Sequence, residues 1–99
     1  MKIERVDLSV LKQDQHKFFS DVFVDELLVY KHENEYFAIS TFCPHFGGPL
    51  VLADGKLNCY WHDWDFHLTE HHCINRRIDV KAKKYKVKLI SDNTLEISE

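Results

Sequence analysis

Two stretches, "CPHFGGPL" at residues 43–50 and "CYWHDWDF" at residues 59–66, each carry one cysteine and one histidine among turn residues and aromatics. Thiolate and imidazole suit zinc, copper and iron–sulfur centres better than calcium or magnesium. A single Cys/His pair is usually a chance neighbourhood, but two hairpin loops that face each other can supply four ligands. Glycines 47 and 48 would let the first loop bend back so that its backbone approaches the metal. The two stretches therefore predict a metal or cluster site.

Short β-type segments surround both loops, and no long helical pattern occurs. A polar turn over 32–35, an Asp-Gly turn at 54–55 and a Ser-Asp-Asn turn at 91–93 separate them. Ser9–Lys12 could form one helical turn capped by Ser9. We therefore expect a small antiparallel all-β domain with the Cys/His loops projecting from it. The segments rich in β-formers or alternating in polarity are Val22–Val24, Leu27–Tyr30, Tyr36–Ile39, Lys56–Cys59, Tyr85–Leu89 and Thr94–Ile97.

The composition is that of one soluble globular domain over residues 1–99, with 44% hydrophobic and 29% charged residues. The longest apolar runs, such as Leu27–Tyr30, are too short to span a membrane, and the charged N-terminus has no apolar signal segment. Three cysteines, an odd number, favour a reducing compartment over a disulfide scaffold. We therefore expect a cytoplasmic protein that does not bind membranes.

Charge is distributed unevenly within the net value of −3, which gives no indication of nucleic-acid binding. Around the two loops, residues 43–72 hold four acidic residues against Lys56 alone. This surplus predicts docking to a positively charged partner surface, with an interaction that salt weakens. The four acidic residues are Asp54, Asp63, Asp65 and Glu70.

The pattern Cys43-x-His45 followed by Cys59-x-x-His62 resembles the Rieske iron–sulfur motif. Trp61, Trp64 and Phe66 also match the second loop of the ferredoxin and ring-hydroxylating oxygenase branches. The resemblance implies a Rieske-like β-sandwich or barrel with cluster-binding loops at about 43–50 and 59–66, and one [2Fe–2S] cluster per chain. Cys43 and Cys59 would bind one iron, and His45 and His62 would bind the other.

The chain departs from the family pattern at several positions. Tyr60 replaces a usual proline, Asp63 a usual glycine, and no proline-bearing third loop is evident. Gly48 and Trp61 stand where respiratory members have a disulfide that braces the cluster. Trp64 and Phe66 stand where those members have hydroxyl donors to sulfur. Fewer donors destabilise the reduced cluster, so the resemblance implies a low potential within the family range.

The resemblance implies a soluble one-electron carrier, and not an enzyme, that passes electrons from a reductase to a terminal oxygenase or another redox acceptor. We expect a monomer. Two alternatives remain open, namely a small Rieske-like subunit of a larger reductase and a structural zinc domain that uses the same two cysteines and two histidines.

Several other residues carry competing interpretations. Adjacent histidines rarely share one metal, so Glu70–Cys73 is expected as an exposed or partly covered loop, with a covering third loop as the alternative. We place His67 on the solvent side of a strand and Phe18 and Phe19 in the core. The lysines from 81 to 88 alternate with apolar residues and indicate a solvated strand face and not a nucleic-acid site.

Overall fold

The computed structural model describes residues 2–43, 48–53, 55–59, 61, 64–71, 73–74 and 81–99. Apart from one 3₁₀ turn, the regular structure in these residues is all β, and the pairings between strands are antiparallel. The expected antiparallel all-β class is confirmed. The chain forms two compact units, Met1–Ile39 with Lys84–Glu99 and Ser40–Lys83, which are described separately. That residues 1–99 act as a single domain stays a prediction.

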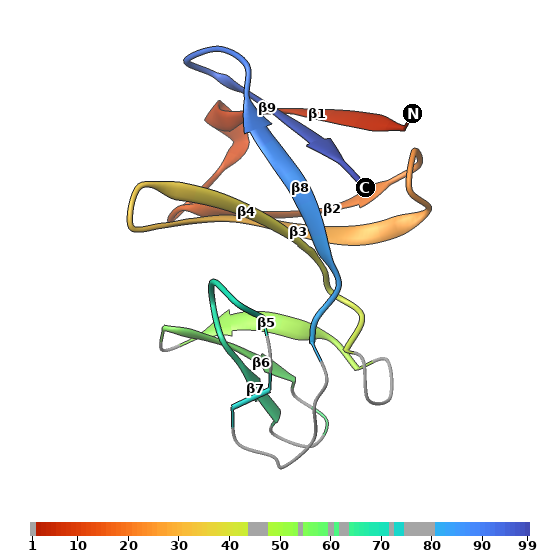
Figure 1. The fold of residues 1–99 in the computed structure, drawn as a ribbon, viewed down its shortest axis with the longest axis vertical. Coiled ribbons are helices and arrows are strands. Elements are labelled where there is room, and N and C mark those ends of the chain that lie inside the picture. The colour runs from red at the N-terminus through yellow and green to blue at the C-terminus, as the bar shows by residue number, and fades with distance from the viewer. Residues whose placement is uncertain are drawn as a thin grey trace. The chain divides into compact units, whose positions relative to one another are not determined.

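The first unit contains a six-stranded sheet in the order β1-β9-β8-β4-β3-β2 (Figure 1). Strands β4 and β8 pair through Ala38 with Tyr85 and Ile39 with Lys84. Next to this pairing, Ser40 N donates to Lys83 O at 2.9 Å. The hairpin β8–β9 has four paired positions, from Lys86 with Ser98 to Leu89 with Leu95. Its strands are β1 (Ile3–Asp7), β2 (Gln15–Ser20), β3 (Asp25–His32), β4 (Glu35–Ser40), β8 (Lys84–Leu89) and β9 (Thr94–Ser98).

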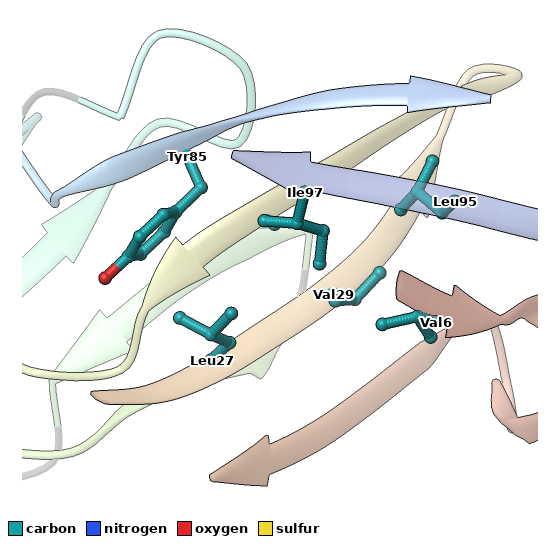
Figure 2. Packing of buried hydrophobic residues seen from close by; sticks show 7 residues of the cluster. Val6, Leu27, Val29, Tyr85, Leu95 and Ile97 are labelled. Carbon is teal, nitrogen blue, oxygen red and sulfur yellow. The ribbon is translucent and has the colours of Figure 1, made fainter. Parts of the chain in front are cut away.

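The core of this unit comes from alternate residues of its strands, because successive side chains point to opposite faces. Figure 2 shows Tyr85, Leu95 and Ile97 of β8 and β9 pointing toward Leu27 and Val29 of β3. Each such side chain contributes about 1.5–3 kcal/mol when it is fully buried. The lysines of β8 lie exposed on the opposite face, as the alternation predicts.

Tyr85 connects β8 to the start of β3. Its hydroxyl donates a hydrogen bond to Asp25 Oδ2 at 2.7 Å, and the Phe23 ring lies 4.8 Å from its ring centre. Burial, reinforced by this hydrogen bond, raises the pKa of Tyr85 above its ordinary value. The hydrogen bond to Asp25 and the ring contact with Phe23 hold the residues between β2 and β3 in place.

The expectation of a strand at Val22–Val24 is wrong. Ser20 pairs with Asp25, so the four residues between them form the turn of the β2–β3 hairpin. Phe23 donates its backbone N–H to Ser20 Oγ at 3.2 Å, and Val24 has a left-handed φ of 51°. Strand pairing and the packing of Phe23 on Tyr85 outweigh the β propensity of the segment.

Two further expectations need correction. The helical turn spans Leu8–Val10, and its cap is Asp7, whose side chain accepts a hydrogen bond from Ser9 N. The cap is therefore the carboxylate of Asp7, two residues before Ser9, and Ser9 supplies the backbone donor. Phe18 packs against the core, but Phe19, its neighbour on the other face of β2, is exposed.

The second unit contains a three-stranded sheet, β5 (Leu50–Ala53), β6 (Lys56–Cys59) and β7 (Trp64–Phe66), in that order (Figure 1). Gly55, in the turn between β5 and β6, has a φ of 76°, which fits the predicted turn; Asp54 lies outside the described residues. In the part of the chain that is described, no helix is long and apolar enough to cross a membrane.

Candidate metal centre

The two arms of the first Cys/His loop are held together by backbone pairing. Leu50 N donates to Thr41 O at 2.9 Å, Phe42 pairs with Pro49, and Cys43 N donates to Gly48 O at 2.9 Å. Three consecutive rungs therefore hold Cys43 opposite Gly48 at the base of the loop. The Cys43 side chain is fully buried.

The second cysteine lies at the end of a strand. Cys59 is the last residue of β6, where it pairs with Leu50 of β5 on one side and Trp64 of β7 on the other. Its side chain is fully buried. Leu50 follows the first loop directly, so its pairing with Cys59 brings the base of that loop beside the second cysteine.

Gly48 makes this approach possible because it has no side chain. A Cβ at this position would lie 2.9 Å from Cys59 Sγ and 2.9 Å from Cδ2 of Trp61, closer than real Cβ atoms come. Gly48 does not have a left-handed φ. Gly48 is therefore not required for a left-handed angle. The bend at residues 44–47 lies outside the described residues, so the expected tight bend stays a prediction, whereas the backbone of Gly48 approaches the sulfur of Cys59 closely.

The structure brings two of the four predicted ligands to one place: Cys43 bonds to Gly48 through the backbone, and Gly48 lies against Cys59 Sγ. His45 and His62, the other two, lie outside the described residues, as do Tyr60 and Asp63. Within the described ranges no three His, Cys, Asp or Glu side chains are grouped to hold a metal, so Cys73 does not join the two cysteines as a third ligand.

The described residues fit an iron–sulfur or zinc centre. Both sulfurs are shielded from water, no described cysteine is in a disulfide, and thiolate is the ligand that such metals prefer. Trp61 contacts Gly48 with one side of its indole while 60% of the residue stays exposed. Trp61 thus fills the space beside Gly48.

The opposite face of the β6–β7 hairpin carries a polar network that sequence reasoning missed. Asp65 accepts a hydrogen bond from Asn58 Nδ2 at 2.7 Å through Oδ1, and Lys56 Nζ lies 2.9 Å from its Oδ2. The Asp65 side chain is only 11% exposed. Strand alternation could have suggested the network, because residues 56 and 58 point to the face opposite Cys59.

This network corrects the predicted acidic surface. Asp65 is buried and its charge is compensated by Lys56, so it adds little to an exposed negative patch. Glu70 is exposed, as the prediction requires. Asp54 and Asp63 lie outside the described residues, and their share of the predicted patch stays a prediction.

The segment after β7 folds back on the sheet. His67 is half-buried and follows the strand, and its Nδ1 accepts the backbone N–H of Thr69 and of Glu70, each at 3.3 Å. A position on the solvent side of a strand is therefore wrong for His67. Its ring instead holds the turn that begins after β7.

The expectation of an exposed or partly covered loop over residues 70–73 is wrong for His71 and Cys73, which are both buried. His71 has a φ of 62°, donates its N–H to His67 O and accepts the N–H of Ala82 at 2.8 Å. Cys73 pairs with Phe66 of β7 in an isolated antiparallel bridge. These backbone bonds, with Phe66 and His67 before the segment and Ala82 after it, hold the segment against the chain. His72 lies outside the described residues.

Comparison with known proteins places this arrangement among characterised folds. The family model for the Rieske [2Fe-2S] domain matches residues 4–86. A stretch of 47 residues is 36% identical to "Apoptosis-inducing factor 3" of Mus musculus and of Homo sapiens, but it covers 44% of this chain and only 8% of those relatives.

Among solved structures, the Sphingomonas yanoikuyae B1 ferredoxin superposes with a TM-score of 0.78 at 18% identity, covering 100% of this chain and 99% of that one. The ferredoxin of carbazole 1,9a-dioxygenase from Nocardioides aromaticivorans IC177 gives 0.75 at 20% identity, covering 99% and 98%. A putative NADH-dependent nitrite reductase small subunit from Mycobacterium tuberculosis gives 0.70 at 10% identity, covering 98% and 94%. At these identities the likeness is one of fold.

Proposed function

Because the chain belongs to the Rieske [2Fe-2S] domain family, we propose that it is a one-electron carrier whose cluster is held by Cys43, His45, Cys59 and His62. The observation that carries this proposal is the meeting of two buried thiols from separate loops at Gly48. Carrying one electron is the chemistry that a Rieske cluster supplies when bound.

We propose the following roles for the chain's own residues. The thiolates of Cys43 and Cys59, which are both buried, would hold one iron of the cluster. The neutral imidazoles of His45 and His62 would hold the other iron. Gly48 leaves room for Cys59 Sγ, and Trp61 packs beside it. The Rieske family match and the fold likeness to ferredoxins support a carrier and not an enzyme.

For the partners, we propose a reductase as donor and a terminal oxygenase or another redox protein as acceptor. Solved structures similar in fold include complexes of oxygenase and ferredoxin in carbazole 1,9a-dioxygenase. That association supports a redox-protein acceptor for this chain. We further propose that the protein is a soluble, cytoplasmic monomer.

A second candidate function is that of a small subunit within a larger reductase. The fold likeness to the nitrite reductase small subunit favours it, and size-exclusion chromatography of the protein from its native source tests it. A carrier elutes at the mass of the 99-residue chain, whereas a subunit co-elutes with a larger flavoprotein or haem protein.

The spectrum of the purified protein tests the main proposal. We expect visible absorption, iron and acid-labile sulfide in equal amounts, and a Rieske-type EPR signal after reduction by dithionite. A colourless protein that contains zinc would instead support the structural zinc domain.

Cysteine variants test the ligand set. We expect Cys43→Ser and Cys59→Ser to abolish the cluster and to lower stability, because metal binding and folding are coupled. Cys73→Ser is the matched control: Cys73 is also buried but does not group with the other two, so the colour should remain. Loss of colour in Cys73→Ser with colour kept in Cys59→Ser would show the assignment to be wrong.

A further inference from the structure

The ion pair between Lys56 and Asp65 is unusual in its burial. Their charged atoms lie 2.9 Å apart, and the Asp65 side chain is 11% exposed whereas that of Lys56 is 42% exposed. The second carboxylate oxygen is bonded to Asn58 at 2.7 Å. A carboxylate so shielded from water interacts with nearby charges more strongly than an exposed one does.

The pair belongs to the same β6–β7 hairpin as Cys59 and lies on the face opposite the Cys59 side chain. Asn58 is the Cα partner of Asp65, and Cys59 is the partner of Trp64, so the backbone of Asp65 is one residue along the ladder from the Cys59–Trp64 pair, and its carboxylate is on the other face. Cross-strand Cα atoms are roughly 4.5–5.5 Å apart. Asp65 O also accepts the N–H of Ile74, so its backbone is held on both sides.

These positions assign two separate tasks. The Asp65 carboxylate anchors β6 to β7 through Asn58, and this task requires an acceptor beside Cys59. A negative charge there also opposes the addition of an electron to a centre bound by Cys59. We propose that Lys56 compensates this charge and thereby sets the reduction potential of the cluster.

The inference rests on the proposed function, because it needs a centre at Cys59, but it adds a residue that no ligand motif contains. Lys56 acts on the centre through Asp65 and is therefore a positioning and tuning residue. Removing the positive charge of Lys56 and removing the negative charge of Asp65 should shift the reduction potential in opposite directions. The loss of a merely structural contact would not depend on the sign of the charge.

The test is the midpoint potential of four loaded variants at pH 8 and low ionic strength. Lys56→Gln leaves the carboxylate uncompensated, so the potential should fall. Asp65→Asn keeps an acceptor for Asn58 and leaves the ammonium uncompensated, so the potential should rise. Each change should alter the equilibrium constant for reduction about three- to tenfold, ~30–60 mV at ~59 mV per tenfold for one electron. The double variant, neutral like the native pair, should return close to the native value, and Lys56→Arg should retain it.

Two exposed residues give matched controls for formal charge. Glu70→Gln removes the same charge as Asp65→Asn, and Lys88→Gln the same as Lys56→Gln, but both groups are exposed. Their shifts should be less than half of those at the buried pair, because water and salt screen exposed charges.

Shifts in the same direction for Lys56→Gln and Asp65→Asn would overturn the inference, as would shifts equal to those of the exposed controls. Failure of both single variants and of the double variant to bind the cluster would assign the pair a structural role only. Failure of the proposed function is seen separately, because the native protein would then show no Rieske signal at all.

Discussion

Gly48 allows the two loops to meet because it has no side chain. Its Cα lies against Cys59 Sγ and the Trp61 ring, and a Cβ would come within 2.9 Å of both. In a packed site such an overlap forces neighbouring atoms to move. The position illustrates that a glycine can be required for space and not for its φ.

We expect Gly48→Ala to destabilise the protein by about 1–3 kcal/mol, the usual cost of overpacking, and to reduce cluster content. Denaturant unfolding and the ratio of visible to ultraviolet absorption measure the two effects. Gly55→Ala is the control: it strains a φ of 76° but meets no atom within 4 Å. It should cost stability while the cluster content stays native, and equal cluster loss in both variants would contradict the steric explanation.

Phe66 lies fully buried in β7, opposite Leu57 and Cys73. The resemblance to the Rieske family places a hydroxyl donor at this position in high-potential members. Phe66→Tyr should therefore raise the midpoint potential, because a donor to ligand sulfur stabilises the reduced cluster. Phe37→Tyr adds a hydroxyl at another buried phenylalanine and should leave the potential unchanged. A lower or unchanged potential in Phe66→Tyr would mean that the new hydroxyl does not reach sulfur.

At the scale of elements, the β2–β3 hairpin shows pairing overriding local preference. Val24 is 74% exposed and adopts a φ of 51°, which β-branched residues rarely tolerate. The pairing of Ser20 with Asp25 and the contact of Phe23 with Tyr85 hold the turn in this conformation. The strain is therefore imposed by the rest of the unit.

Val24→Asn should stabilise the protein by about 0.5–1 kcal/mol, because asparagine tolerates left-handed angles and the valine makes little buried contact. The free energy of unfolding from denaturant titration measures the gain. Val22→Asn, in the same turn but without a left-handed φ, is the control and should give no gain. Equal stabilisation by both changes would point to solubility or to the unfolded chain and not to relief of strain.

At the scale of the whole molecule, charge governs docking. Lys56 neutralises Asp65, so the predicted negative surface depends on Asp54, Asp63 and Glu70. We expect oxidation of the reduced protein by a cationic cobalt(III) hexaammine complex to slow as ionic strength rises, and oxidation by anionic ferricyanide to accelerate. Stopped-flow absorbance measures both rates. Flat or reversed salt dependence would mean that the surface near the cluster is not negative.

The loaded protein should be a low-potential member of its family. No disulfide can form between Gly48 and Trp61, and no hydroxyl is present at Trp64 or Phe66. We expect a midpoint on the order of −150 mV, far below the upper family limit of about +300 mV. Protein-film voltammetry at neutral pH measures it, and a strongly positive value would rule this prediction out.

The sequence by itself determined the all-β class, the turns that flank Lys56–Cys59 and Thr94–Ile97, and the positions of both loops. These features follow from local chemistry: alternating polarity selects a strand, turn residues end it, and Cys and His select a class of metal. The four proposed ligands also came from this local pattern. The structure brings Cys43 and Cys59 to Gly48, and the full ligand set stays a prediction.

Only the tertiary structure decided which residues meet across the chain. It turned Val22–Val24 into a hairpin loop, buried His71 and Cys73, and paired Asp65 with Lys56. Each outcome depends on backbone pairing or burial against partners that no local pattern specifies, since propensity is weaker than the packing and hydrogen bonds that compete with it. The need for a glycine at position 48 also depends on tertiary structure, because the sulfur for which it leaves room belongs to a residue eleven positions further along the chain.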